Sequence, residues 1–367
     1  MATVYDIALA MTPRIGNASC RRLMELCPSP EALFSMSHSQ LKELFGNHIE
    51  IISDIENRTS LAHAEEEMQF VERYKLRALF FTDPEYPQRL NREECSDSPS
   101  LIYVKGDTDL NAERTVSIVG TRRATSHGRE NTAAIVHQLQ QYNPYIISGL
   151  AYGIDTAAHT AALENNLPTV AVLGHGLDRI YPTANRALAK RILDQGGALI
   201  TEYPSGTAIN PSYFPARNRI IAALGDATVV VEASNKGGAL ITAAIAASYH
   251  RDVFAIPGRL SDTYSTGTNN LIATNHAYLM RNADDLAMQL GWPISGHQTN
   301  LIEEPQQKTL TPDERHITEL LGSHTAMTLD QLVNLSNLPM PKVASILFNL
   351  EAAKVIRILP GQLYELC

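Results

Sequence analysis

The stretch TVSIVGTRRATSHG, residues 115–128, joins an apolar run to a short polar segment. Its first part, TVSIVG (115–120), is an apolar run of the kind found in strands that are buried on both faces of a sheet. A glycine ends the run, a short polar loop follows, and a helix is predicted to begin near Gly128. The stretch therefore predicts a buried strand, a loop and a helix in immediate succession.

The same succession recurs along residues 81–290. Further strand runs are YIIS (145–148), TVAVL (169–173), ALIT (198–201), ATVVVEA (227–233) and DVFAIP (252–257). Helical stretches follow or precede them at 128–141, 155–166, 184–195, 216–224 and 239–250. Strand and helix in repeated alternation are typical of a doubly wound parallel sheet. We therefore predict an α/β domain with a mostly parallel sheet over residues 81–290.

Two smaller domains are predicted to flank the sheet. Residues 1–80 contain short amphipathic helical pieces joined by Pro and Gly turns, which predicts a small helical domain of the helix-hairpin kind. Residues 291–307 have no periodicity and are interpreted as a linker. Residues 308–367 are expected to form three helices and a β-hairpin with Pro-Gly at its turn, which indicates a winged helix-turn-helix.

The flanking domains carry little positive charge. Residues 1–80 hold 8 Lys and Arg against 11 acids, which favours a cap or a partner-binding role over DNA binding. Residues 308–367 hold 5 basic and 6 acidic residues, and the expected recognition helix offers only Lys342 and Lys354. On electrostatics alone, this tail is expected to contact another protein or to pack in a dimer rather than read duplex DNA.

Composition narrows the class of protein. The 367 residues carry a net charge of -9, which excludes a surface that is basic all over but allows a local basic groove. The four cysteines form no CxxC pair, so they are interpreted as free thiols rather than disulfides or a zinc site. The sequence shows no signal peptide and no apolar run long enough to span a membrane. We expect a soluble, cytoplasmic protein without membrane association.

The loop after the first predicted strand is suited to an anion. Gly120 and Thr121 are followed by Arg122 and Arg123, and a helix N-terminus lies behind them. Backbone amides, the helix dipole and guanidinium groups together favour phosphate. The loop has neither the lysine and spacing of a P-loop nor the GxGxxG pattern of a dinucleotide fold, so ATP hydrolysis and NAD binding are not indicated.

The loop after the second strand, SGLAYGIDTAAH (148–159), contributes Ser148, Gly149 and Gly153 to the candidate site, because its glycines allow close backbone approach. Asp155 stands where a helix starts and is interpreted as an N-cap rather than a catalytic carboxylate. His159 is expected to pack in the core rather than act in catalysis.

Further loops bring positive charge to the same edge of the sheet. Lys236, Gly237 and Gly238 stand at a predicted helix N-terminus. They form a second candidate phosphate-binding site. The loop GHGLDRIYP (174–182) is also glycine-rich and carries Arg179. Because the charges are spread over several loops, a polyanion is a better ligand than a mononucleotide.

The segment SYFPARNRII (212–221) places an aromatic pair and two arginines at the head of an apolar helix. Pro215 suits the first helical turn. Residues two apart on a helix point about 200° apart, so Arg217 and Arg219 face nearly opposite directions. We predict that Arg217 contacts phosphate, with Asn218 beside it, and that Arg219 is structural and either pairs with an acid or caps a neighbouring loop. Phe214 is a candidate for base stacking, although packing of its ring in the core remains an alternative.

Several ordered motifs give the sequence a family resemblance. They are IVGTRRATSHG, SGLAYGIDTAAH, TVAVLGHGLDRIYP, LITEYP, FPARNRIIAAL, VVVEA, GGALITAA and VFAIPG, all within residues 118–258. Together they resemble the DNA-processing protein A (DprA/Smf) family of bacteria. The resemblance implies a Rossmann-like fold that binds single-stranded DNA, and a homodimer that protects incoming DNA and helps to load the RecA recombinase in natural transformation. It implies no catalysis and no cofactor.

The resemblance also assigns roles to residues. It marks Arg122 as the arginine of the G-[ST]-R motif, Phe214 as the aromatic before ARNR, and Lys236 to Gly238 as the Lys-Gly-[SG] turn. Many members have Ser-Gly-Ser in that turn, whereas this chain has Gly237, Gly238 and Ala239. Two hydroxyl donors are therefore missing, and contacts there are expected from backbone amides or Lys236.

Two other functions remain open at this point. A nucleotide-cleaving phosphoribohydrolase has a similar layout, but its PGGxGTxxE motif corresponds here to NKGGALITA, which lacks the acid. A pure assembly module without affinity for nucleic acid is the second alternative. The family resemblance implies a dimer surface in the middle domain, and our hypothesis places it on the helix 239–247 or on the strand after it.

Overall fold

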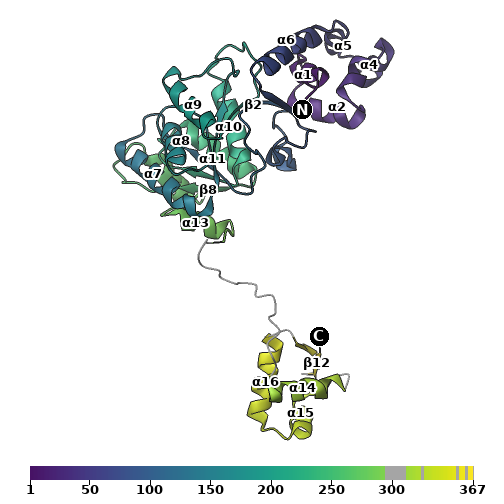
Figure 1. The fold of residues 1–367 in the computed structure, drawn as a ribbon, viewed down its shortest axis with the longest axis vertical. Helices are drawn as coiled ribbons and strands as arrows, with labels where there is room; N and C mark the ends of the chain where they lie inside the picture. The colour runs from purple at the N-terminus through teal and green to yellow at the C-terminus, as the bar shows by residue number, and fades with distance from the viewer. Residues whose placement is uncertain (294–310, 324–325, 353–354, 360–362, 367) are drawn as a thin grey trace. The chain divides into compact units, whose positions relative to one another are not determined.

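The computed structural model describes residues 1–293, 311–323, 326–352, 355–359 and 363–366. The chain forms two compact units, Met1–Gln298 and Thr299–Cys367 (Figure 1). In the described residues, no helix is long and apolar enough to cross a membrane. The predicted linker 291–307 lies outside the described residues from 294 onward. The predicted domain boundaries at residues 80, 290 and 307 stay predictions.

A nine-stranded sheet organises the first unit, in the order β1-β2-β6-β5-β4-β3-β7-β8-β9. Its strands are β1 (Arg77–Phe80), β2 (Leu101–Lys105), β3 (Thr115–Val119), β4 (Tyr145–Ser148), β5 (Thr169–Leu173), β6 (Ala198–Thr201), β7 (Ala227–Val230), β8 (Asp252–Ala255) and β9 (Tyr278–Leu279). Strands β3 to β9 pair in parallel, whereas β2 is antiparallel to both β1 and β6. The predicted α/β fold with a mostly parallel sheet is confirmed.

Helices cover both faces of this sheet. They are α7 (Ser126–Leu139), α8 (Ile154–Glu164), α9 (Arg186–Asp194), α10 (Tyr213–Leu224), α11 (Gly238–Ser248), α12 (Thr266–Ala273) and α13 (Ala283–Gln289). Apolar residues of α10 and α11 form one buried cluster with the sheet, and those of α7, α8 and α13 form another. Alternate residues of a strand enter the two clusters: Ile118 of β3 belongs to one and Val119 to the other. This two-sided burial explains why the strands are apolar runs.

The first 80 residues are mainly helical. Their helices are α1 (Val4–Met11), α2 (Asn17–Leu26), α3 (Pro30–Phe34), α4 (His38–Phe45), α5 (Ile49–Glu56) and α6 (Thr59–Arg73). The core of this segment includes Ala78 and Phe80 of β1 and Leu101 and Tyr103 of β2. The helical segment therefore shares its core with the antiparallel edge of the large sheet.

Some element boundaries differ from the predictions. Helix α10 begins at Tyr213 rather than 216, so Phe214 and Pro215 both lie in its first turn. Strands β7 and β8 end three and two residues earlier than predicted, because the chain leaves the sheet to form the loops at its carboxyl edge. Strand β9 was not predicted, because two residues give no period to detect.

The second unit contains α14 (Pro312–Gly322), α15 (Leu329–Ser336) and α16 (Met340–Ala352), with a three-stranded sheet in the order β10-β12-β11. The strands are β10 (Met327–Thr328), β11 (Ile356–Leu359) and β12 (Leu363–Leu366). Thr311 and Glu314 form a capping box at the start of α14. Three helices followed by paired strands confirm the winged-helix prediction. Lys354 and the predicted Pro-Gly turn lie outside the described residues.

Candidate nucleic-acid interface

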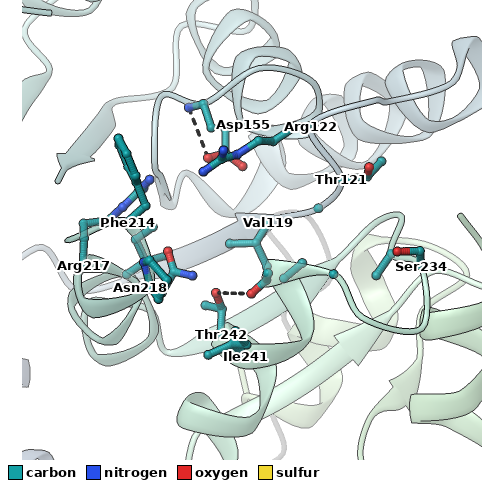
Figure 2. A pocket seen from close by; sticks show the side chains of 18 residues that line it. Val119, Thr121, Arg122, Asp155, Phe214, Arg217, Asn218, Ser234, Ile241 and Thr242 are labelled. Carbon is teal, nitrogen blue, oxygen red and sulfur yellow. Dashed lines mark hydrogen bonds between the residues drawn. The ribbon is translucent and has the colours of Figure 1, made fainter. Parts of the chain in front are cut away.

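A pocket of about 330 Å³ opens at the carboxyl ends of β3 and β7, between α10 and α11 (Figure 2). It is lined by Val119, Gly120, Thr121, Arg122, Ala151, Asp155, Phe214, Pro215, Arg217, Asn218, Ile221, Ala233, Ser234, Gly237, Gly238, Ala239, Ile241 and Thr242. From β3 the chain adds β4, β5 and β6 on one side and then returns to place β7 on the other. This reversal of strand order is where doubly wound sheets bind ligands.

The loop after β3 is held in shape by Glu232, which follows β7. The Thr121 N–H donates to the Glu232 carbonyl at 2.7 Å. The Glu232 carboxylate accepts the Thr125 N–H at 3.0 Å and the Thr125 hydroxyl at 2.5 Å, while Thr125 caps α7. Gly120 packs so closely on Ile154 that a Cβ there would lie 2.5 Å from Cγ1. These contacts fix the backbone that presents Arg122 to the pocket.

Arg122 and Phe214 meet at the mouth of the pocket. The Arg122 guanidinium carbon lies 5.5 Å from the centre of the Phe214 ring, in cation–π range. Arg122 is exposed, and Phe214 is half-buried rather than enclosed in the core. Tyr181 is 41% exposed, and the centroid of its ring lies 5.5 Å from that of the Phe214 ring, with the two planes tilted by 36°. A cation and two aromatic rings therefore share one accessible edge.

Arg217 lies beneath that edge and is 3% exposed. Its guanidinium occupies the space beside Gly149, where a Cβ would lie 1.4 Å from Nη1. Nε and Nη1 are buried without a hydrogen-bond partner among the described residues. Burial lowers the pKa of Arg217 to about 10, against the opposing attraction of Asp155. A buried guanidinium with unused donors beside a pocket is a ready partner for a ligand oxygen.

Arg219 points to the opposite side of α10, as the helical spacing predicts. Its Nη2 lies 2.6 Å from the Glu202 carboxylate, and its Nε lies 3.8 Å from Asp97. The prediction that this arginine pairs with an acid is confirmed. The two arginines of the motif therefore divide into one that faces the pocket and one that ties α10 to the loop after β6.

Asp155 is placed differently from the prediction. Gly153 is the N-cap of α8, and Asp155 is the second residue of that helix. Its carboxylate accepts the Ala151 N–H at 3.3 Å, so it braces the loop ahead of the helix. Burial raises the pKa of Asp155, and the Arg217 charge opposes that shift. The N-cap assignment is therefore wrong by two positions, because the positive φ of Gly153 (+81°) starts the helix.

His159 is fully buried, as predicted, and its Nδ1 lies 2.7 Å from the Thr169 hydroxyl oxygen. Burial and the positive charge of Arg217 lower its pKa to about 3. The ring is therefore neutral in the folded protein at any pH near neutrality.

Stability is expected to fall below pH 6.5 because of His159. The unfolded chain binds a proton at the ordinary pKa of about 6.5, while the folded state does not bind it until about pH 3. Between pH 7 and pH 5 this difference costs about 2 kcal/mol of unfolding free energy. Urea unfolding at both pH values should show that His159→Gln loses this dependence, whereas His127→Gln, at an exposed position, keeps it. Equal pH dependence in the two variants would contradict the assignment.

The structure brings most of the predicted site residues together. The pocket includes Gly120, Thr121, Arg122, Phe214, Arg217, Asn218, Gly237 and Gly238. Arg123 is exposed on the same loop as Arg122. Lys236 is exposed and lines a neighbouring hollow along α11, together with Asn235 and Leu240.

The three predicted residues of the loop after β4 lie behind the pocket. The Ser148 hydroxyl is buried and donates to the Ile118 carbonyl at 2.7 Å. Gly149 accommodates the Arg217 side chain, and Gly153 packs against the Thr121 carbonyl, where a Cβ would lie 2.2 Å away. Gly149 and Gly153 therefore shape the site through their contacts with α10 and the loop after β3, and the Ser148 hydroxyl is used within the sheet.

Sequence reasoning missed several lining residues. Ile221 is four residues beyond Arg217 on α10, and Thr242 is four residues beyond Gly238 on α11. That helical spacing places them on the same face as the predicted residues and could have identified them. Tyr181 and Glu232, which contact the site without lining the pocket, carried no such signal, because their contacts cross between distant loops.

Comparison with known proteins identifies the family. Residues 77–291 match the family described as DNA recombination-mediator protein A, and residues 302–362 match the DprA winged helix domain. The chain is 36% identical over 321 residues to Protein Smf of Synechocystis, covering 85% of this chain and 77% of that protein. It is 33% identical over 365 residues to a putative DNA processing protein DprA of Mycobacterium tuberculosis, covering 94% and 90%.

Two solved structures are similar in fold. DNA processing protein A of Streptococcus pneumoniae superposes with a TM-score of 0.68 at 32% identity, covering 78% of this chain and 98% of that one. DNA processing protein A of Helicobacter pylori, whose structure is described as giving insight into a single-stranded DNA binding mode, has a TM-score of 0.52 at 30% identity and covers 59% and 95%. The chain belongs to the DNA recombination-mediator protein A family, whose relatives carry the names DprA and Smf.

Proposed function

We propose that this protein binds single-stranded DNA in the pocket at the carboxyl edge of its sheet and acts there as a recombination mediator without catalysing a reaction. One observation carries the proposal. An exposed guanidinium (Arg122) lies over a half-buried aromatic ring (Phe214), and the same pocket is lined by a buried guanidinium (Arg217) whose Nε and Nη1 have no hydrogen-bond partner among the described residues.

The chemistry of the pocket suits an unpaired nucleotide. Phosphate oxygens can accept hydrogen bonds from the guanidinium groups, and the aromatic rings can stack on a base. A base can enter a pocket only when it is not stacked and paired in a duplex, so a single strand is favoured. Lys236 and the free amides at the start of α11 would extend the charged track beyond the pocket. Backbone amides of Gly238 and Ala239 would take the place of the missing serine hydroxyls.

Binding of labelled oligonucleotides tests the proposal. Fluorescence anisotropy at low salt should show tighter binding of oligo-dT than of a blunt duplex of equal length. The affinity should fall steeply as salt rises, because phosphate contacts release counterions. Equal affinity for the two oligonucleotides, or no binding at low salt, would contradict the proposal.

We further propose that the protein is a homodimer and that it helps RecA to assemble on the bound strand. The description of the family as recombination mediators and the motif resemblance support this role. Light scattering should give twice the mass of one chain. RecA ATP hydrolysis on oligo-dT coated with single-strand-binding protein should begin earlier when this protein is present. An unchanged lag would contradict the mediator role.

A further inference from the structure

A buried carboxylate of the helical segment holds the loop that leads to the pocket. Glu67 of α6 is 5% exposed. Both of its carboxylate oxygens lie 3.0 Å from the Ser205 N–H, and one accepts the Ser205 hydroxyl at 2.5 Å. The partners are 138 residues apart in sequence. A carboxylate only accepts hydrogen bonds, so it matches the two donors of Ser205.

Ser205 lies in the segment between β6 and α10, which Glu202 also ties to α10 through Arg219. Residues 208–212 are exposed, and Ile209 is 40% exposed. Helix α10, with Phe214 in its first turn, begins directly after this segment. The position of that first turn therefore depends on where the segment is anchored.

Contacts run from the anchored segment to the aromatic edge of the pocket. The Tyr203 ring stacks on Tyr213, the first residue of α10, with centroids 4.3 Å apart. Pro204 and Ser205 lie against Gly176, where a Cβ would be 2.5 Å from the Pro204 carbonyl oxygen. In the loop that contains Gly176, Gly174 packs against Phe214, and a Cβ added at Gly174 would lie 3.2 Å from Cδ1 of Phe214. The loop around Gly176 continues to Tyr181, the ring beside Phe214.

We infer that Glu67 is a positioning residue of the DNA pocket: it fixes Ser205, and through Ser205 the placement of Tyr213, Phe214 and Tyr181. This role rests on the proposed DNA binding at that pocket. The helical segment then serves as part of the site's scaffold as well as a cap on the edge of the sheet.

Glu67→Gln tests the inference, with Glu66→Gln as the control. Gln keeps the size of the side chain but turns an amide NH2 toward the Ser205 donors. Glu66 is exposed one residue away, so its variant makes the same charge change. Hydrogen exchange of the free protein should be faster at amides 203–214 in Glu67→Gln than in Glu66→Gln. Oligo-dT binding should weaken about 5-fold to 10-fold in Glu67→Gln only, about 1 kcal/mol.

Two further variants separate positioning from general destabilisation. Ser205→Ala removes one donor and should show the same effects in weaker form, even where Glu67→Gln folds poorly. In a Phe214→Ala background, Glu67→Gln should cost little additional affinity, since it acts through that ring. The inference would be overturned if hydrogen exchange at amides 203–214 were unchanged in both Glu67→Gln and Ser205→Ala. It would also be overturned if Glu67→Gln cost as much oligo-dT affinity in the Phe214→Ala background as in the unaltered protein. If the unaltered protein failed to bind oligo-dT, the proposed function would be wrong. The hydrogen-exchange measurement would still show whether the contact of Glu67 with Ser205 fixes the segment.

Discussion

Reversing the charge of Arg122 (Arg122→Glu) is expected to weaken oligo-dT binding about 100-fold at low salt, about 2.7 kcal/mol. The exposed guanidinium lies over the Phe214 ring at the mouth of the pocket, where a phosphate and a base would both meet it. The substitution removes a charge-assisted hydrogen bond and places a carboxylate against the DNA backbone. The loss should be similar for all sequences, because a phosphate contact carries no base information.

Arg191→Glu is the matched control for this prediction. Arg191 is exposed near the C-terminal end of α9, which packs on β5 and β6, and it is not among the residues that line the pocket. It makes the same change in net charge, so any effect of overall charge appears in both variants. Anisotropy titrations at several salt concentrations should show a shallower salt dependence for Arg122→Glu alone. Equal weakening by both variants would show that net charge, rather than this site, governs binding.

Replacing Arg217 by methionine is expected to lower the unfolding free energy by about 3 kcal/mol at pH 7. Asp155 then keeps a buried negative charge without the opposing cation. Its pKa is already raised by burial, and removal of Arg217 should raise it further. A carboxyl group whose pKa is higher in the folded state destabilises the fold only when it is ionised. The loss of unfolding free energy in Arg217→Met should therefore shrink as the pH falls toward 4.

The double variant Arg217→Met with Asp155→Asn separates charge from packing. It should recover at least half of the lost stability at pH 7, because neither buried charge remains. Oligo-dT affinity should stay low in both variants, since both lack the buried donors under Phe214. Urea unfolding at pH 4 and pH 7 measures the first effect, and anisotropy measures the second. If the loss of unfolding free energy in the double variant equalled the sum of the losses in Arg217→Met and in Asp155→Asn, the electrostatic coupling of the two residues would be contradicted.

Much of the fold could be predicted because strands that are buried on both faces leave a long apolar signal. Strands β3 to β8 have that signal, whereas the two residues of β9 do not. Strands β1 and β2 lie at the edge of the sheet and share the core of the helical segment, so no strand–helix alternation marked them. The opposite directions of Arg217 and Arg219 followed from helix geometry alone.

The parts of the site that could not be predicted depend on contacts between distant segments. Glu232 fixes Thr125 from 107 residues away, and Glu67 fixes Ser205 from 138 residues away. Ser148 has the residue type of a phosphate ligand, but its hydroxyl is used within the sheet by the Ile118 carbonyl. Sequence pattern shows which loops meet at the edge of a parallel sheet, but not which side chains of those loops are already used by the fold.

A crystal structure of this protein with a short oligo-dT would show directly whether single-stranded DNA binds at the carboxyl edge of the sheet. We expect one nucleotide to occupy the pocket between α10 and α11, with a phosphate oxygen or base on Arg122 and Arg217 and a base against Phe214. Electron density for the oligonucleotide on the winged-helix unit or another surface, with this pocket free of nucleotide, would contradict it.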